Sequence, residues 1–456
     1  METLLRRAAH EKGGVMSHTK MRVRKHVNAD ALFELVYTEC EKIPDLCERP
    51  VEISVADALK SGFAMFSLKD PSLLAFDQRR YDATKLKNLQ TIYHIGTVPC
   101  DTQLRVILDQ VYPEELAPVF RAIFRQAQRG KALEKLVFWE DCYLLSLDGT
   151  QYFSSKKIHC PSCLVKTHAK TGEVTYSHQL LAAAIVHPDC AEVIPVCPEP
   201  IQKHDGETKN DCERNAAKRF LEQFRRQHPH LGVIVTEDGL SSNAPHIREL
   251  LRHDMHFILG AKPGDHAWLF AQVEQAAQRG DTLEFSVQSE DVTHRFRCLN
   301  TVALNESNQD LLVNFLEYWE VQADGSTQHF SWVTDIPITR DNAMHLMRGG
   351  RARWKIENET FNTLKNQGYH CEHNYGHGHD NLSVVFALLM MLAFLVDQVV
   401  QLTCRLFQAV WRKEGSKTRM WEHLRALFYS LEFASMVDIF KALLYGYRVD
   451  RVVILE

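Results

Sequence analysis

The stretch "VFWEDCYLLSLDGTQYF", residues 137–153, marks a change in the character of the chain. It is rich in β-branched and aromatic residues, and its apolar run leads to an Asp-Gly pair at Asp148, which is typical of a turn. We therefore expect a buried strand that ends at Asp148. A second stretch, "GVIVTEDGLSS" (residues 232–242), repeats this pattern and predicts another buried strand that ends at Asp238.

Strand-like and amphipathic helical runs alternate around these two stretches. About three strands are followed by a helix, a strand, a helix and a strand, which predicts a mixed α/β layer. The chain before residue 138 reads as mostly helical, and the helices return after residue 334. We expect these segments: a basic tail (1–27), a helical domain (28–137), the first part of an α/β core (138–262), a β-rich insertion (263–334), the second part of the core (335–410) and a helical C-terminal region (411–456).

Composition places the chain among ordinary soluble globular proteins. It has 456 residues, 45% of them hydrophobic and 24% charged, and a net charge of −5. This balance does not indicate a polyanionic partner for the whole chain. The first 27 residues are locally basic, which is typical either of an arm that touches nucleic acid or of a solvated, disordered start.

One apolar segment resembles a membrane span. It runs from Leu382 to Val396, about 15 residues against the roughly 20 that a spanning helix needs, and Asp397 and Gln398 follow it. We expect a buried core helix that ends there, and no membrane partner.

The twelve cysteines are expected to be free thiols, because the N-terminus lacks the features of a secretory signal. One group stands out in "KKIHCPSCLVKTH", residues 156–168, where Cys160 and Cys163 precede His168, with His178 nearby. Cys-x-x-Cys followed by His is compatible with a structural Zn²⁺, and the alternative is a hairpin that carries free thiols. A further histidine-rich loop, "HCEHNYGHGHD" (370–380), suits either close approach to a phosphate backbone or a plain connection.

Asp148 and Asp238 occupy matching positions. If their strands are neighbours, the two carboxylates lie close enough to share a hard cation, which would neutralise their mutual repulsion. The alternative is that both Asp-Gly pairs simply form turns. Glu237 is expected to point to the other face of its strand.

The stretch "RARWKIENETFNTLKNQGY", residues 351–369, predicts one helix that supplies a third acid. Helical spacing puts Arg353 and Glu357 on the apolar side and Glu359 away from it. The alternative is a solvated helix with ordinary ion pairs. Three acids on two strands and a helix would form a site for two divalent ions, which activate water or a 3′ hydroxyl at a phosphodiester.

The four stretches "LSLDGTQYF", "VIVTEDGLSSN", "RARWKIENETFNTLK" and "EHNYGHG", taken together, resemble the DDE-type insertion-sequence transposases. The resemblance implies an RNase H-like mixed sheet interrupted by the β-rich insertion. It implies that Asp148, Asp238 and Glu357 bind two Mg²⁺ or Mn²⁺ ions for strand nicking and strand transfer. Phosphate contacts are expected from Arg353, Lys365 and Lys262.

Two positions depart from the family's signature around the glutamate. The signature has a tyrosine where this chain has Gly350. It also has six residues between the glutamate and a lysine, whereas seven separate Glu357 from Lys365 here. The assignment of Lys365 is therefore less direct than that of Glu357.

Some members of the family use a tryptophan of the β insertion to hold a flipped base while a DNA hairpin forms. Trp319 and Trp332 lie in or at the edge of the insertion here. Stacking on an aromatic ring can hold an extruded base, although a strand tryptophan also commonly belongs to a core.

The resemblance also implies the partners. They would be double-stranded DNA, both element ends and target, bound by a homodimer at the nucleoid in the cytoplasm, with the helical domain recognising the ends. The alternative function is that of a domesticated transposase that binds DNA without cutting it.

Overall fold

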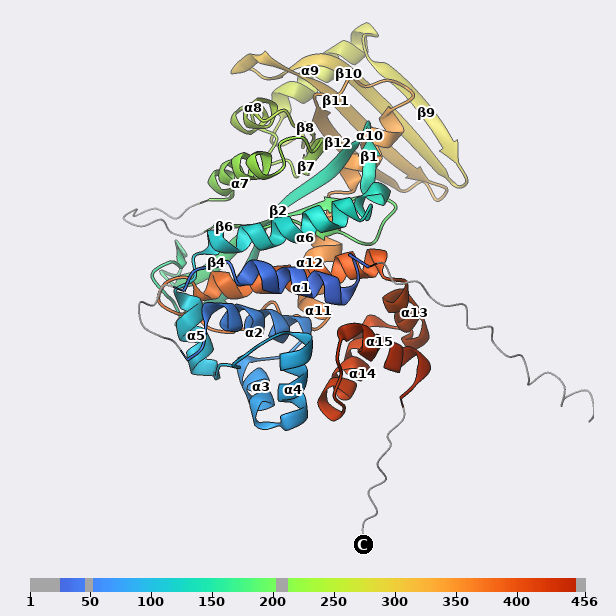
Figure 1. Ribbon diagram of the computed structural model, residues 1–456. Helices are drawn as coiled ribbons and strands as arrows, with labels where there is room; N and C mark the ends of the chain where they lie inside the picture. Colours follow the sequence, from blue (N-terminus) through green and yellow to red (C-terminus); the bar gives the residue numbers. More distant parts are fainter. Residues whose placement is uncertain (1–24, 46–51, 202–211, 448–456) are drawn as a thin grey trace, which may run out of the picture.

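The computed structural model describes residues 25–45, 52–201 and 212–447, which form a mixed α/β fold around one large sheet (Figure 1). Most of the predicted basic tail lies outside the described residues. The strands are β1 (Val137–Trp139), β2 (Cys142–Ser155), β3 (Leu164–Thr167), β4 (Val174–Val186), β5 (Ile194–Pro195), β6 (Glu199–Ile201), β7 (Val233–Glu237), β8 (His256–Gly260), β9 (Leu283–Ser289), β10 (Val292–Asn305), β11 (Asn308–Gln322) and β12 (Thr327–Thr334).

The α-helices surround the sheet and extend the molecule away from it. They are α1 (Ala29–Cys40), α2 (Val55–Ser67), α3 (Leu73–Asp77), α4 (Ala83–Ile92), α5 (Asp101–Asp109), α6 (Ala117–Arg129), α7 (Glu213–Gln227), α8 (Ala244–Arg252), α9 (Ala267–Arg279), α10 (Ala343–Arg351), α11 (Asn362–Asn366), α12 (Leu382–Thr403), α13 (Arg405–Glu414), α14 (Lys417–Ser430) and α15 (Met436–Tyr445).

The centre of the sheet combines antiparallel and parallel strand pairs. β2 pairs antiparallel with β4 and parallel with β7, and β7 pairs parallel with β8. The parallel steps use α7 and α8 as crossovers, as the order of strands and helices predicted. The fold class predicted from the sequence is confirmed.

One prediction about β2 is wrong. The Asp148–Gly149 pair is not a turn, because β2 continues to Ser155 and pairs Asp148 with Ala182 of β4. The pairing between β2 and its parallel neighbour β7 ends at Ser146. Beyond that residue β2 pairs with β4 alone, so the apolar run ends near Asp148. The change from apolar to polar residues therefore marks the loss of a neighbour and not the end of the strand.

The insertion widens the same sheet. β9 to β12 form antiparallel pairs in sequence order, and β12 joins the core by pairing with β8. The predicted β-rich segment also contains a helix, α9, whose Leu269, Val273 and Ala276 are buried. Their spacing of four and three residues is helical, and the prediction missed it.

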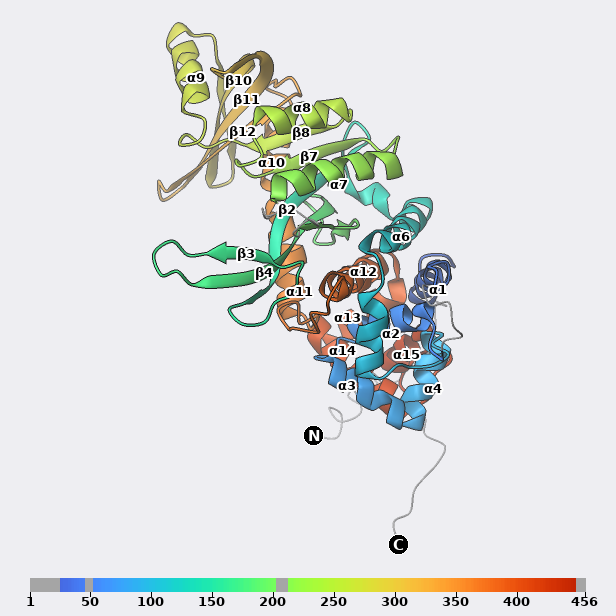
Figure 2. The ribbon, with the colours of Figure 1, turned by 90° about the vertical axis from the view of Figure 1, so that its left-hand side faces the viewer.

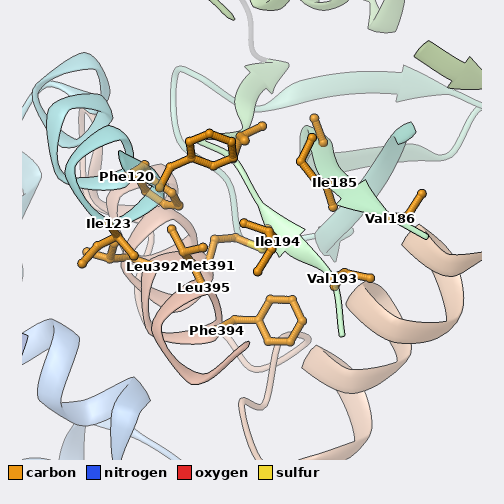
Figure 3. Packing of buried hydrophobic residues seen from close by; sticks show 14 of the residues in the cluster. Phe120, Ile123, Ile185, Val186, Val193, Ile194, Met391, Leu392, Phe394 and Leu395 are labelled. Carbon is orange, nitrogen blue, oxygen red and sulfur yellow. The ribbon is translucent and has the colours of Figure 1, made fainter. Parts of the chain in front are cut away.

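Helix α12 lies within the hydrophobic core of the molecule. It has 22 residues and does not end at Asp397 as predicted. Although it is long and apolar enough to cross a membrane, 94% of the most apolar part is buried inside the protein. Figure 3 shows its Met391, Leu392 and Leu395 packed against α6 and β5. The polar residues of its last turns are bonded internally: Gln398 accepts the Val193 N–H at 3.1 Å.

The N-terminal and C-terminal helices form one body at the end of the molecule opposite the insertion (Figure 1). Asp30 of α1 accepts the N–H groups of Met436 and Val437 at 2.7 and 3.2 Å, which caps α15. Asn88 of α4 donates to the Phe428 carbonyl of α14 at 2.8 Å. The two predicted helical regions therefore share an interface although more than 300 residues separate them.

Candidate active site

Asp148 and Asp238 lie at the same level of two adjacent strands. The parallel ladder pairs Ser146 of β2 with Thr236 of β7. Asp148 lies two residues further along β2, and Asp238 lies two residues beyond Thr236, directly after the end of β7. Since side chains alternate along a strand, the two carboxylates share one face. Glu237 takes the other face, as predicted, and contacts His246 of α8 at 2.5 Å.

Glu357 comes from a broken helix. Residues 351–369 do not form the single helix predicted: α10 ends at Arg351, and the chain resumes as a π-helical turn, η4 (Ile356–Phe361), before α11. Ser146 of β2 donates to the Arg353 carbonyl at 3.3 Å, which fixes the intervening turn to the sheet. This break brings Glu357 to the strand that carries Asp148.

Arg353 links two of the three acids. Its Nη1 donates to Glu357 Oε1 at 2.7 Å and reaches Asp148 Oδ2 at 3.5 Å. Its guanidinium also stacks on the ring of Trp354, 4.6 Å from the ring centroid. Trp354 is 50% exposed and lines the same cleft as Arg353. The arginine holds the side chains of the site together by a charge-assisted contact.

The site concentrates negative charge in a partly desolvated place. The pKa of Asp148 is raised to about 7: burial is the largest cause, the charge of Arg353 opposes it, and the charges of Glu357 and Glu213 add to it. Carboxylate oxygens are the ligands that hard divalent cations prefer. A cation would remove the repulsion that raises this pKa, so the donor set fits the divalent ions that the family uses.

Glu213 is an acid near the site that the sequence reasoning missed. It is the first residue of α7, and a Cβ added at Gly149 would lie 2.6 Å from its Oε2. Burial raises the pKa of Glu213, and the charges of Glu237 and Asp238 raise it further. No pattern in the sequence singles out Glu213, because an acid in the first turn of a helix is common. Its closeness depends on Gly149, the small residue beside Asp148.

A cleft of about 280 Å³ opens beside Asp238 and is also lined by Lys262, Trp332 and Arg353. Lys262 is exposed, and its side chain packs against Gly239. A Cβ added at Gly239 would lie 3.4 Å from the Cγ of Lys262. Lys262 and Arg353, two of the side chains predicted to bind phosphate, therefore line the same cleft as Asp238.

Lys365 does not join this group. It is exposed on α11, and its ammonium lies 3.0 Å from Glu372. Glu359, the rival acid, is also elsewhere: its charge acts on Lys417 of α14. Of the two glutamates, the structure brings Glu357 to Asp148.

The structure accounts for both departures from the signature. A Cβ at Gly350 would overlap the indole of Trp332, so no tyrosine fits there. The additional residue between Glu357 and Lys365 coincides with η4, and a π turn uses about one residue more than an α turn. The π turn therefore accommodates the additional residue, but it does not bring Lys365 to the acids.

The two tryptophans of the insertion differ. Trp332 is 5% exposed and stacks on Phe330, so it is a core residue in this structure. Trp319 is half-buried and stacks on His329, with ring centroids 5.1 Å apart.

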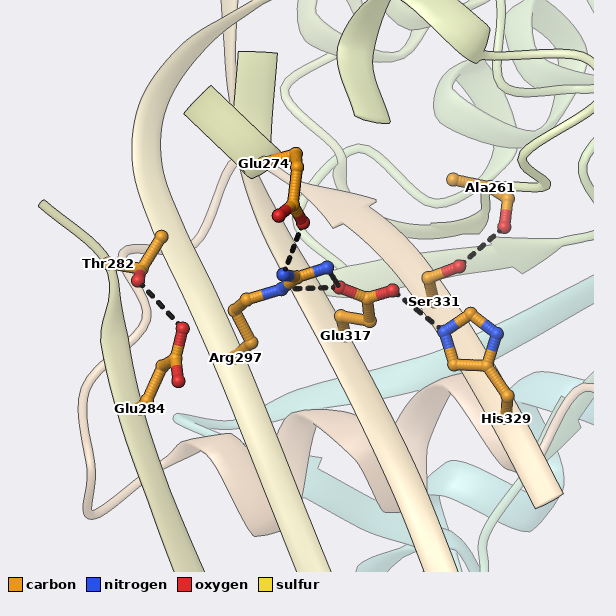
Figure 4. A network of polar contacts seen from close by, with 8 residues as sticks. All are labelled: Ala261, Glu274, Thr282, Glu284, Arg297, Glu317, His329 and Ser331. Carbon is orange, nitrogen blue, oxygen red and sulfur yellow. Dashed lines mark hydrogen bonds and ion pairs between the residues drawn. The ribbon is translucent and has the colours of Figure 1, made fainter. Parts of the chain in front are cut away.

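Figure 4 shows the polar network around Glu317. Glu317 is bonded by Arg297 Nε and by His329 Nε2, both at 2.8 Å. This network fixes the imidazole on which Trp319 stacks. Of the two rings, Trp319 is the one left partly open to a ligand.

The cysteine group differs from its prediction in one member. His168 is exposed and bonds Thr175 at 3.2 Å, away from the cysteines. The imidazoles of His178 and His377 take its place beside Cys160 and Cys163. The prediction chose the histidine nearest in sequence, but the antiparallel pairing of β3 and β4 carries His178 back to the cysteines, and His377 arrives from the histidine-rich loop.

Three comparisons with known proteins bear on these observations. Residues 198–395 match the family described as the transposase DDE domain. Among curated proteins, none matches the chain significantly. A cryo-EM structure of a piggyBac transposase synaptic complex with hairpin DNA is similar, with a TM-score of 0.41 and 8% sequence identity over 94% of this chain and 84% of that chain.

The matched region contains β7, the whole insertion, and the segment with Arg353 and Glu357, whereas Asp148 precedes it. The match agrees with the resemblance predicted from the sequence: residues 198–395 of this chain are similar to the transposase DDE domain.

Proposed function

We propose that this chain is a metal-dependent DNA transposase that cuts and joins phosphodiester bonds at the ends of a mobile element. One observation carries the proposal. Asp148 and Asp238 lie level on adjacent parallel strands, and Arg353 joins Glu357 to Asp148 at their edge. Nothing in ordinary packing requires these acids to meet at one partly buried place.

Asp148, Asp238 and Glu357 would hold two Mg²⁺ or Mn²⁺ ions. When bound, such ions activate the attacking water or 3′ hydroxyl and stabilise the leaving oxygen. The chain itself orients these ligands: β2 and β7 fix the two aspartates, and the Ser146 bond to the Arg353 carbonyl fixes the turn before Glu357. Glu213 adds negative charge near Asp148, and this charge favours a site with a bound cation over an empty one.

DNA would run along the cleft beside Asp238. Lys262 is free to contact a phosphate there, and Arg353 can exchange its acid partners for one when cations neutralise the carboxylates. Trp319 offers the partly exposed ring suited to an unstacked base. Joining two element ends requires two active sites, so we propose a homodimer on DNA at the nucleoid, with the α1–α6 region reading the ends.

A nicking assay on the DNA that flanks the coding region tests this function. Wild type should nick the element ends only with Mg²⁺ or Mn²⁺, and Asp148→Ala should not. Glu359→Gln is the matched control, because this acid lies outside the site, and it should nick as wild type does. If wild type bound the ends but never nicked them, the protein would be the DNA-binding derivative of a transposase and the catalytic proposal would fail.

A further inference from the structure

A second group of potential metal ligands lies on the outer part of the sheet, away from the carboxylates. We name Cys160, Cys163, His178 and His377 the thiol–imidazole cluster. Its four ligand atoms all lie within 4.8 Å of one another. The two sulfurs are 3.8 Å apart, and His178 Nε2 is 3.3 and 3.4 Å from them. His377 Nε2 lies 3.2 Å from Cys163 Sγ.

These distances are close to the edges of a zinc tetrahedron. Bonds of about 2.3 Å to sulfur and about 2.0 Å to nitrogen, at tetrahedral angles, separate two sulfurs by about 3.8 Å and a sulfur from a nitrogen by about 3.5 Å. Hydrogen bonds alone do not explain the arrangement. His178 Nε2 faces two sulfurs with a single hydrogen or lone pair, and Cys163 Sγ faces both imidazoles and the other thiol.

The cluster is largely buried, and aromatic rings enclose it. Cys163 is 1% exposed and His178 is 2% exposed. The rings of Tyr152 and Phe153 pack on the imidazoles, with centroids 5.9 Å from His178 and 4.2 Å from His377. The Cys160 N–H also points at Cys163 Sγ, 3.4 Å away, where it would stabilise the charge of a thiolate.

The loop that carries His377 is fixed without a metal. Its two neighbours, Gly376 and Gly378, have φ values of 150° and 62°, which other residues rarely adopt. Asp109 of α5 then accepts the backbone N–H groups of the next four residues, His379 to Leu382, at 2.7 to 3.0 Å. The chain therefore presents the imidazole of His377 to the cysteines through a preformed loop.

We propose that the thiol–imidazole cluster binds one Zn²⁺ as a closed, structural site. Four protein ligands fill a tetrahedral shell and leave no position for substrate, which distinguishes this site from a catalytic one. Cys160, Cys163 and His178 belong to β2–β4, and His377 lies between α11 and α12. In Figure 2 the β3–β4 hairpin projects from the sheet beside α11, and Ser162, just before β3, donates to the Asp380 carbonyl of the loop at 3.4 Å.

The zinc thereby ties together two parts of the core that are distant in sequence. β2 carries Asp148, and the loop of His377 follows the segment that carries Glu357. Asp148 and Phe153 are five residues apart on β2, so the zinc is roughly 17 Å along the strand from the acids. The inference is independent of the proposed activity, because an inactive protein would bind this metal equally well.

Metal analysis of the purified full chain tests the proposal. Wild type should contain about one zinc per chain that millimolar Mg²⁺ does not displace. After exchange with Co²⁺ it should show the visible absorption of a tetrahedral site and the charge-transfer band of thiolate–cobalt bonds. Cys163→Ser and His377→Ala should lose both signals, whereas His168→Ala should keep them, because His168 is outside the cluster.

His377→Cys keeps the test decisive if the other variants fail to fold. Three cysteines and one histidine also make a common zinc site, so this variant should retain zinc, with a stronger thiolate–cobalt band. The proposal is overturned if wild type purified without chelators holds no stoichiometric zinc and cannot take up Co²⁺. It is also overturned if His168→Ala loses the metal while His377→Ala retains it.

Discussion

The carboxylates around Asp148 and the thiol–imidazole cluster sit on the same strand and its neighbours, but they are built in opposite ways. The carboxylates are partly open to a cleft, crowd like charges, and rely on one arginine for compensation. The cluster is buried, has four ligands of the type that zinc prefers, and is enclosed by aromatic rings. The carboxylate site lowers the stability of the fold but allows metal and substrate to exchange. The cluster is suited to holding one metal ion permanently.

This difference predicts opposite responses to mutation. Removing a charge from a crowded acid site relieves repulsion, so it should harm activity while leaving the fold intact or strengthening it. Removing a ligand from a closed structural site should harm the fold first.

The largest expected effect is on activity. Glu357→Gln should lower the nicking rate by roughly a thousandfold, because it removes a charged ligand at the place where charge develops in the reaction. Rates of nicking on element-end DNA with saturating Mg²⁺ measure this effect. Glu359→Gln should stay close to wild type. Equal losses of nicking rate in the two variants would contradict metal binding by Glu357 and indicate that the π-helical segment has a structural role only.

The next effect is on stability. Cys163→Ser should lower the free energy of unfolding by about 3 kcal/mol, because loss of a metal site is among the most destabilising changes. Denaturant unfolding of zinc-loaded protein measures it. Cys212→Ser, at an exposed position, is the matched control and should change little. An equally small loss in both variants would contradict a structural role for the cluster.

A smaller effect of opposite sign is expected at Asp148. Its folded pKa of about 7 lies above the usual value of 3.8, so its contribution to stability is fully present below about pH 4 and is lost as pH rises through 7. Asp148→Asn resembles the protonated form and should therefore stabilise the protein at pH 8, by about 1–2 kcal/mol after solvent screening.

The gain from Asp148→Asn should vanish at pH 4, and also at pH 8 with saturating Mg²⁺, which stabilises only the wild type. Thermal unfolding at both pH values, with and without Mg²⁺, measures it. Destabilisation by this substitution at pH 8 without metal would show that the carboxylates are not crowded.

The smallest effect concerns DNA affinity. Lys262→Ala should weaken binding several-fold and reduce the slope of affinity against salt by about one, because it removes one phosphate contact in the cleft. Lys365→Ala should change both less, since Lys365 lies outside the cleft beside Glu372. Binding titrations at several salt concentrations measure this. The reverse ranking would move the DNA path from the cleft to α11.

The sequence was most informative where local pattern and tertiary structure agree. The apolar runs before Asp148 and Asp238 predicted buried strands, and these strands are adjacent and parallel. Helical phase separated Glu357 from Glu359, although the helix is broken and contains a π turn. The two side chains still point in different directions, because both residues lie within the same π turn, after the break.

Features that depend on distant partners could not be predicted. β2 continues through an Asp-Gly pair because β4 pairs with it, and α12 continues past Asp397 because Lys69 and Tyr369 bind that carboxylate. His377 reaches cysteines more than 200 residues earlier only through the fold. A search for ligands near in sequence therefore chose His168, noted His178 only as a neighbour, and did not connect the loop of His377 with the cysteines.

The central claim is that one chain holds two metal sites of different kinds, and anomalous diffraction tests it most directly. Crystals of the zinc-loaded protein grown with Mn²⁺ would be measured at the manganese and zinc absorption edges. We predict manganese among Asp148, Asp238 and Glu357, and zinc at the centre of the thiol–imidazole cluster. Manganese absent from the three carboxylates, or zinc absent from the four thiol and imidazole ligands, would contradict the account.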